Sequence, residues 1–473
     1  MITEIEPVIT TQKSHPFATA VHKLAFTENG YEENEFFIHG TANVYTGDSA
    51  NDLKIVHQSV PYCNRILIRR PSDYSKISGN IVIEILNSTA DFDIDRIWIV
   101  SGKELMRNGA VYIGITSKPN VLKSLTDFDG DRYNKLSWEI PYARKNIYER
   151  TDNKVFNDCP ENCEMGLFWD MLTDIALLLR TDTTLFSCGK RRKLILTGWS
   201  QSVSYMATYV KYFVLHKQSE RIFDGYLAAG GVHSFETPLN QAEYGKDIDP
   251  AFLKLSYMPV PYIAVQTETE NAKFGGHEVQ QEDSDEKTFL YRLYELSGPT
   301  HDTKYSLLDY YCDDADLLKI HMLPEYVSKD PYPNDYPYQF AFAAVMRFLL
   351  DWVRDGILPP HASRIPVDAG LNNKTDEFGN ACGGVRSPFI DVPVCTYYNY
   401  SNLPAEYGSE KFNYLFGHIV PFSFEQLHKL YGTLENYSRL VEKSADTQTF
   451  LLPDDKEAAV TEAVGNARRW GLN

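Results

Sequence analysis

The chain has no excess of positive charge. Lysine and arginine number 46 against 64 aspartates and glutamates, so the formal net charge is −18. Nucleic-acid binding depends on clustered cations, and a surface of net negative charge repels a phosphate backbone. We therefore expect no nucleic-acid partner.

A long apolar run is missing too. The nearest candidate, Met165 to Leu179, is interrupted by Asp170 and Asp174, whereas a membrane-spanning helix needs about 20 mostly apolar residues. The first residues, Met-Ile-Thr-Glu-Ile-Glu-Pro, contain neither the positive segment nor the apolar segment of a secretory signal. We expect no membrane partner and no secretion.

Cysteine is sparse and follows no pattern. Seven cysteines are scattered along 473 residues, and only Cys159 and Cys163 lie close together, with no histidine nearby. An odd number at irregular spacing is typical of free thiols in a reducing compartment, which predicts a cytoplasmic protein. Neither His-Glu-x-x-His nor a cluster of cysteines and histidines occurs, so the sequence predicts no metal and no cofactor.

The chain does contain short β-branched runs bounded by turn residues. Such runs are typical of strands that are buried on both faces of a sheet. Shorter extended pieces, such as Glu35 to His39, occupy the first 60 residues. The predicted core strands are 81–86, 111–115, 194–196, 262–265 and 289–296.

Helical patterns alternate with these strands. The clearest spans 202–217, where Val203, Met206 and Val210 share one face at helical spacing. The other predicted helices are 97–107, 165–180 and 338–353. This alternation predicts an α/β fold with a mostly parallel, doubly wound sheet.

Two long stretches fall outside the alternation. Residues 119–164 are polar and rich in turn residues, and residues 356–473 follow the last core helix. We interpret residues 1–473 as one elaborated domain with a core at about 76–355. An N-terminal strand region precedes the core, 119–164 form an inserted cap-like loop, and the C-terminal extension 356–473 covers the active-site end. Loops of this length in compact enzymes are often functional.

The sharpest chemical pattern lies at residues 198–202. There a predicted buried strand runs into Gly-Trp-Ser-Gln-Ser and then directly into a helix. This is the context of a nucleophile elbow, commonly Gly-x-Ser-x-Gly, in which a tight turn exposes the serine oxygen at the end of the strand. The alternative is an ordinary helix N-cap at Ser200 or Ser202.

A serine nucleophile needs a base and an acid, which follow it in the order acid, then histidine, in this architecture. His301 lies in a Gly/Pro turn just after the predicted strand 289–296, where a base must lie. Glu268 and Glu270 follow the predicted strand 262–265. Glu270 lies further into the turn and is favoured as the acid, with Glu268 as the alternative.

Acyl transfer also needs two donors for an oxyanion. We expect one to be the backbone N–H of Gln201, which directly follows the serine. The second is expected from the loop after the strand 81–86, at Asn87 and Ser88. The alternative for Asn87 and Ser88 is a plain Asx or Ser turn.

Together these segments resemble the α/β-hydrolase-domain family whose elbow reads Gly-Trp-Ser-Gln-Ser. The similarity covers roughly residues 20–465. Besides the elbow it includes the segments 83–87, 265–270, 294–302 and 376–393. The resemblance implies an α/β-hydrolase fold and a serine esterase-like activity with Ser200 as nucleophile and His301 as base. One departure is Val203, where the family usually carries glycine.

The first hypothesis is therefore a serine hydrolase that cleaves a small-molecule carboxylic ester through Ser200, His301 and a glutamate. Two alternatives stay open: an acyltransferase that uses the same triad, and an inactive hydrolase-fold binding protein. Trp199 and Arg386 are predicted to contact substrate, although Arg386 could instead bridge the extension to the core. The sequence leaves the ester and the oligomeric state open.

Overall fold

The computed structural model describes residues 1–18, 24–142, 159–214, 222–232, 237–243, 254–311, 313–404 and 413–473. Part of the predicted cap-like loop and the end of the predicted helix 202–217 lie outside these residues. The six described cysteines are free thiols. Among the described helices, none combines the length and the hydropathy needed to cross a bilayer.

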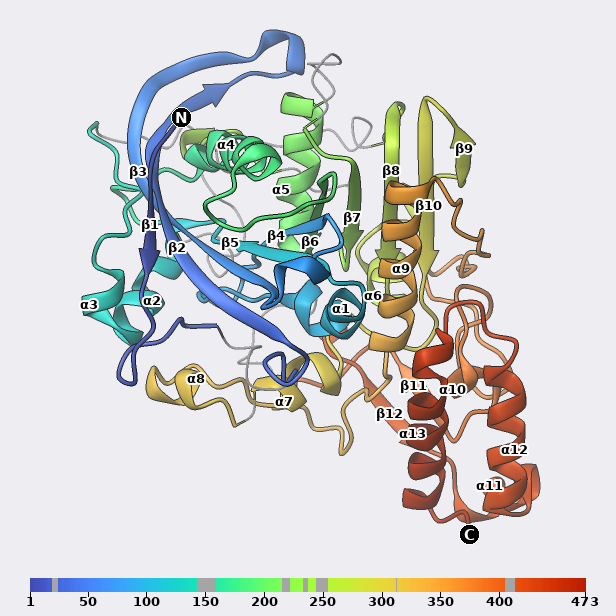
Figure 1. Ribbon diagram of the computed structural model, residues 1–473. Coiled ribbons are helices and arrows are strands. Elements are labelled where there is room, and N and C mark those ends of the chain that lie inside the picture. The colour runs from blue at the N-terminus through green and yellow to red at the C-terminus, as the bar shows by residue number, and fades with distance from the viewer. Residues whose placement is uncertain are drawn as a thin grey trace.

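A ten-stranded sheet runs through the molecule in the order β1-β2-β3-β5-β4-β6-β7-β8-β10-β9 (Figure 1). From β5 to β10 the neighbouring strands pair in parallel, which confirms the mostly parallel sheet. These strands are β4 (Asn80–Ile85), β5 (Val111–Ile115), β6 (Lys193–Trp199), β7 (Gly225–Ala229), β8 (Met258–Gln266) and β10 (Phe289–Glu295).

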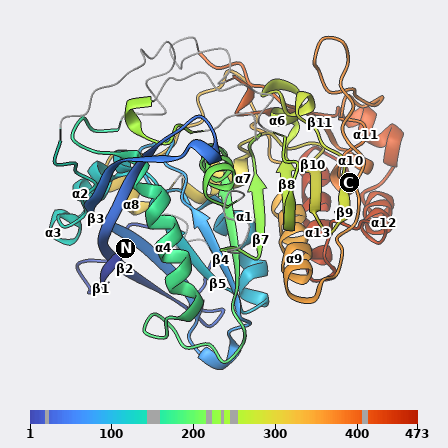
Figure 2. The ribbon, with the colours of Figure 1, turned by 90° about the horizontal axis from the view of Figure 1, so that it is seen from above.

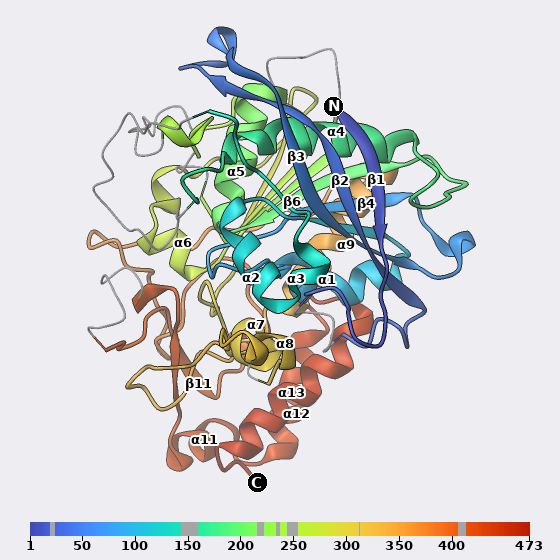
Figure 3. The same cartoon turned by 90° about the vertical axis from the view of Figure 1, so that its left-hand side faces the viewer.

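The N-terminal strands continue this sheet on one side. Strands β1 (Ile2–Val8), β2 (Tyr31–Thr46) and β3 (Lys54–Pro71) pair antiparallel, and β3 joins β5. The long β2–β3 hairpin curves across the molecule (Figure 3). At the opposite edge, β9 (Ser284–Glu286) pairs antiparallel with β10. The sheet thus begins before residue 76, the predicted start of the core.

Helices cover both faces of the sheet. Helices α1 (Arg96–Arg107) and α9 (Gln339–Asp355) bury their apolar sides in one core cluster, and α4 (Phe168–Thr181) and α5 (Gln201–Tyr209) in another. Shorter helices lie in the connections: α2 (Leu122–Phe128), α3 (Gly130–Tyr133), α6 (Glu268–Lys273), α7 (Lys304–Tyr311) and α8 (Ala315–Lys319). This is the doubly wound arrangement that the sequence predicts.

The C-terminal extension lies on the side of β8 and β10, opposite the N-terminal strands (Figure 2). A parallel bridge joins Leu296 to Val385 and another joins Asp302 to Phe416, so the extension reaches the C-terminal ends of the core strands. Its elements are α10 (Pro388–Asp391), β11 (Cys395–Tyr398), β12 (His418–Pro421), α11 (Phe424–Tyr431), α12 (Leu434–Ala445) and α13 (Lys456–Arg469).

Two buried arginines of β3 hold the loop between β4 and α1 in place. Arg65 lies 3.1 Å from Glu35 on β2 and 2.8 Å from Asp93 in the loop, and all three side chains are almost fully buried. The loop that carries Asn87 and Ser88 is therefore attached to the sheet by a charged contact. Arg69 repeats the arrangement with Asp95 at 2.5 Å.

Arg65→Leu is expected to lower the free energy of unfolding by about 3–5 kcal/mol, because it leaves the buried carboxylate of Asp93 without its cation. Glu35, by contrast, keeps Arg132 at 2.6 Å. Urea unfolding followed by circular dichroism measures the change. As a control, Arg354→Leu removes a half-exposed arginine that pairs with Asp351 at 2.9 Å, and it is expected to cost less than about 1 kcal/mol. Equal effects of the two variants would contradict the importance assigned to the buried pair.

Candidate active site

The turn between β6 and α5 holds Ser200 in a strained conformation. Its φ is 57° and its ψ is −118°, values that L-residues rarely adopt. The backbone is fixed on both sides, because Ser200 N–H donates to Ala229 at 2.9 Å and Ser200 C=O accepts from Val203 at 2.9 Å. A positive φ at a serine between a strand and a helix is the geometry of a nucleophile elbow.

Small residues make this turn possible. A Cβ atom at Gly198 would lie 2.9 Å from the Cβ of Ser202, so Gly198 leaves room for a serine at the last position of the motif. A Cβ atom at Gly231 would lie 2.8 Å from the Cβ of Val203. Val203, the departure from the family pattern, is fully buried, and the glycine opposite it provides its space.

The structure brings Glu270 to His301. The imidazole Nδ1–H donates to Oε1 of Glu270 at 2.6 Å, and both side chains are buried. The other oxygen of Glu270 accepts from the backbone N–H and the hydroxyl of Thr267, at 2.6 and 2.7 Å. These contacts form a capping box at the start of α6, so the cap and the histidine together orient the carboxylate.

Glu268 has different partners. It accepts from the backbone N–H of Gly298 at 2.6 Å and from the side-chain amide of Asn373 at 3.2 Å. Glu268 thus joins the turn after β8 to the loop before His301 and to the C-terminal extension. Of the two predicted acids, Glu270 contacts His301, and Glu268 supports the segments around it.

The charges around the pair favour an ionised acid beside a basic imidazole. Burial raises the pKa of Glu270, but the hydrogen bonds from His301 and Thr267 hold that pKa below its usual value overall. Burial lowers the pKa of His301, but the contact with Glu270 and the charge of Asp302 raise it above 6.5 overall. This pattern is typical of an acid that orients a base.

The C-terminal extension holds the loop that carries His301. The backbone N–H of His301 donates to the hydroxyl of Thr269 at 3.2 Å, and that hydroxyl donates to the carbonyl of Tyr414 at 2.8 Å. The next N–H, of Asp302, donates to Leu415 at 2.9 Å. Residues far along the chain therefore fix the position of the imidazole.

The loop after β4 contacts the Ser200 turn directly. The side-chain amide of Asn87 donates to the carbonyl of Trp199 at 3.0 Å, and the hydroxyl of Ser88 lies 3.4 Å from the amide oxygen of Gln201. The backbone N–H groups of Asn87 and Thr89 donate within the loop, to Ile94 and to the Asn87 side chain. The N–H of Ser88 has no acceptor among the described residues. The side chain of Asn87 joins the loop to the Ser200 turn through its hydrogen bond to Trp199.

A small pocket lies beside this loop. Asn120, after β5, donates to the carbonyl of Ser88 at 2.9 Å. Asn120 also lines the small pocket together with Lys118, Met165 and Tyr205 of α5. The pocket therefore lies beside the loop that contacts the Ser200 turn.

Trp199 is placed beneath the candidate site. Its side chain is 1% exposed and its ring centroid lies 5.6 Å from that of His301 and 5.3 Å from that of Phe342. Successive side chains of a strand point to opposite faces, so the residue before Ser200 faces the core. This placement favours a packing role over the predicted contact with substrate.

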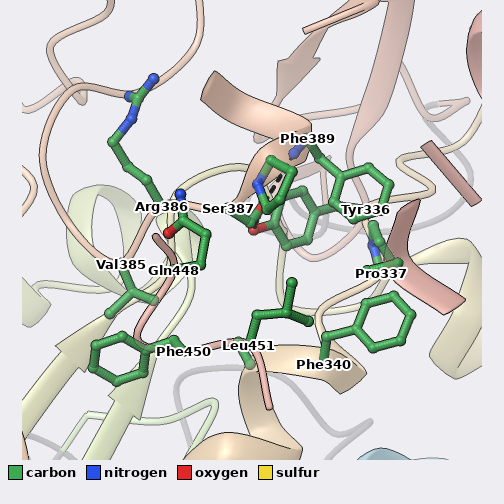
Figure 4. A pocket seen from close by; sticks show the side chains of 13 residues that line it. Tyr336, Pro337, Phe340, Val385, Arg386, Ser387, Phe389, Gln448, Phe450 and Leu451 are labelled. Atoms are coloured by element: carbon green, nitrogen blue, oxygen red, sulfur yellow. Dashed lines mark hydrogen bonds between the residues drawn. The ribbon is translucent and has the colours of Figure 1, made fainter. Parts of the chain in front are cut away.

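Among the described residues, the hydrogen-bond partners of Arg386 all belong to the C-terminal extension. Its guanidinium donates to Asp391 at 2.7 Å and to the carbonyl of Ala381 at 2.7 Å, both within the extension. In Figure 4 the guanidinium points away from the crevice that Tyr336 and Phe389 line. These contacts favour the structural role for Arg386 and not the predicted contact with substrate.

Two features of the site escaped the sequence reasoning. The Thr-x-x-Glu spacing of Thr267 and Glu270 is a capping-box signal that singles out Glu270. The ion pair between Arg96 and Asp302, 2.6 Å apart, joins residues far apart in the chain. Since no local pattern links such residues, the sequence alone carries no signal for it.

The sequence model of the family described as alpha/beta hydrolase domain matches residues 5–461. The chain belongs to this family, and the predicted α/β-hydrolase fold is confirmed. No curated protein matches the chain.

Similar solved structures include an alpha-beta serine hydrolase homologue from Coxiella burnetii, with 10% identity over 55% of this chain and 91% of that one and a TM-score of 0.27. A structure from a study of two fungal esterases from Rhizomucor miehei is 8% identical over 72% of this chain and 90% of that one, with a TM-score of 0.33. The siderophore hydrolase EstA from Aspergillus nidulans is 14% identical over 55% of this chain and 75% of that one, with a TM-score of 0.27.

Glu268 is expected to make the stability of the protein depend on pH. Burial raises its pKa to about 7, against 4.5 ordinarily, although Gly298 and Asn373 oppose the shift. A raised pKa means that the folded state holds an extra proton between these values. The free energy of unfolding therefore falls as pH rises through this window, by on the order of 3 kcal/mol.

Glu268→Gln removes that contribution. The variant is expected to lose less stability than the parent protein between pH 5 and pH 7.5, as measured by urea unfolding at both values. An unchanged difference between the two pH values would show that Glu268 does not titrate in this range.

Proposed function

We propose that the chain is a serine hydrolase that cleaves a carboxylic ester with Ser200, His301 and Glu270. The observation that carries the proposal is the buried hydrogen bond of 2.6 Å between His301 and Glu270, in a chain whose Ser200 occupies a strained turn between strand and helix. These residues also follow one another in the chain order that triads of this architecture show, which is serine, acid, histidine.

In the proposed mechanism Nε2 of His301 takes the proton of Ser200 as the serine oxygen attacks the ester carbonyl. Glu270 holds the opposite nitrogen as a donor and stabilises the imidazolium that forms. His301 then returns the proton to the departing alcohol and leaves an acyl-enzyme. Water, activated by the same histidine, releases the acid.

Two backbone donors are proposed to stabilise the oxyanion. Gln201 is the first residue of α5, where N–H groups point out of the helix end. The N–H of Ser88 lies in the loop that contacts this turn. Fixed donors of this kind stabilise the negative charge that develops on the carbonyl oxygen. The pocket beside Asn120 is the proposed position of the acyl group.

Ser200→Ala is expected to lower kcat for p-nitrophenyl esters at least ~10³-fold, because the nucleophile is removed. The same variant should lose labelling by a fluorophosphonate probe, which intact-protein mass spectrometry measures. Ser202→Ala serves as the matched control, since it removes a neighbouring hydroxyl of the same turn. Retained turnover in Ser200→Ala would refute the proposal. Assaying with added alcohol separates a hydrolase from an acyltransferase through the products.

Glu270→Gln is expected to lower kcat roughly 10²–10⁴-fold and to shift the pH profile. His301 must be neutral to accept a proton, so kcat/KM of the parent protein should rise with pH through a pKa above 6.5. Without the carboxylate, burial dominates and this inflection should move to lower pH. Glu268→Gln should keep the parent inflection. The opposite outcome for the two variants would assign the acid to Glu268.

A further inference from the structure

Arg96 contacts three segments of the candidate site at once. It is the first residue of α1, at the end of the loop that carries Ser88, and its side chain is almost fully buried. Its Nη2 lies 2.6 Å from Oδ1 of Asp302, the residue after His301. Its guanidinium carbon lies 5.6 Å from the centre of the Trp199 ring.

Further contacts hold this ion pair in place. Nη1 of Arg96 donates to the carbonyl of Ser306 at 2.8 Å, and the backbone N–H of Asp302 donates to Leu415 at 2.9 Å. Because the pair is mostly shielded from water, its geometry is fixed and its charges are weakly screened. It therefore acts on its surroundings as two charges at fixed positions.

The charged groups around His301 come from three places. Glu270 belongs to α6, Asp302 belongs to the histidine's own loop, and Arg96 belongs to α1; the fourth neighbour, the Trp199 ring, is uncharged. Burial and Arg96 lower the pKa of His301, whereas Glu270 and Asp302 raise it. One imidazole thus faces two carboxylates and one guanidinium.

Two tyrosines also face Arg96, namely Tyr311 and Tyr338. Burial raises the pKa of Tyr338 to about 12, and phenols ordinarily titrate near pH 10. Tyr338 is therefore neutral between pH 5 and 9. Among the described residues, the charged groups that act most strongly on the pKa of His301 are Glu270, Asp302 and Arg96.

We propose that Arg96 and Asp302 are positioning residues for the base: their ion pair joins the His301 loop to the Ser88 loop and to Trp199, and the guanidinium of Arg96 offsets the negative charge that Asp302 brings beside His301. This inference rests on the proposed function. Two uncompensated carboxylates beside one imidazole would hold it as the imidazolium, which cannot accept the proton of Ser200. Arginine suits this role because it stays charged at every relevant pH.

The test is the pH dependence of the rate at which a fluorophosphonate probe labels Ser200, measured between pH 5 and 9 by mass spectrometry. Arg96→Gln should move the inflection to higher pH by roughly one pH unit, because Asp302 loses its counter-charge. Asp302→Asn should move it to lower pH by a similar amount. Opposite shifts are a result that general damage to the fold does not produce.

Two further variants sharpen the result. Arg96→Lys keeps the positive charge, so the parent inflection should be retained even where the labelling rate falls through lost geometry. The double variant Arg96→Gln with Asp302→Asn removes both charges and should return the inflection towards the parent value. This double variant also keeps the proposal testable if either single change prevents folding.

Arg107→Gln is the matched control. Arg107 lies on the same helix and its Nη1 is 3.0 Å from Asp455, so the variant breaks a partly buried ion pair away from His301. Its inflection should not move. Shifts of the same sign in Arg96→Gln and Asp302→Asn, or no shift in either, would overturn the inference.

Failure of the inference is distinct from failure of the proposed function. If the parent protein is not labelled at Ser200, the proposed function fails and the inference with it. If Ser200 is labelled and Ser200→Ala is inactive while the inflections stay fixed, the triad stands and only the role of the Arg96–Asp302 pair is refuted.

Discussion

The buried hydrogen bond between Glu270 and His301 is the contact on which the candidate site depends. Glu270 uses its second oxygen to cap α6, so the acid is oriented by the start of a helix. The backbone of His301 is tied to Thr269 of the same helix. The acid and the base are therefore both attached to the start of α6. The distance between them does not depend on long flexible connections.

The C-terminal extension is part of this unit. Asn373 donates to Glu268, and the carbonyl of Tyr414 accepts from Thr269. Removing the extension would take one hydrogen bond from each of these buried groups, at a cost of roughly 1–3 kcal/mol for each buried atom left unsatisfied. The extension thus stabilises the segments that carry the acid and the base, and it does so from the edge of the sheet.

Much of the fold follows from local patterns in the sequence. The β-branched runs at β4, β5 and β8 mark central strands, and β5 occupies the predicted residues 111–115. Strand β7 was missed because Gly-Tyr-Leu-Ala-Ala lacks β-branched residues. Its glycine, Gly225, is needed for packing, since a Cβ atom there would lie 2.5 Å from Val353 of α9. Small residues at such a crossing give no strand signal.

The site was predictable to the extent that its residues follow strands. Ser200 and His301 could be placed because parallel strands end at one edge of the sheet. The contacts of Trp199 and Arg386 could not be predicted. A sequence motif does not show which face of the sheet a side chain takes, or which partners already occupy its hydrogen-bonding groups. The Arg96–Asp302 pair depends on the meeting of two distant loops, which only the folded chain defines.

Val203 and Gly231 show how the turn tolerates an unusual residue. The valine fills space that a glycine leaves open on the neighbouring strand end, and the strained backbone of Ser200 is retained. The space that Val203 occupies therefore depends on the absence of a side chain at residue 231. The two positions form a single steric unit, so a change of size at one is constrained by the size of the other.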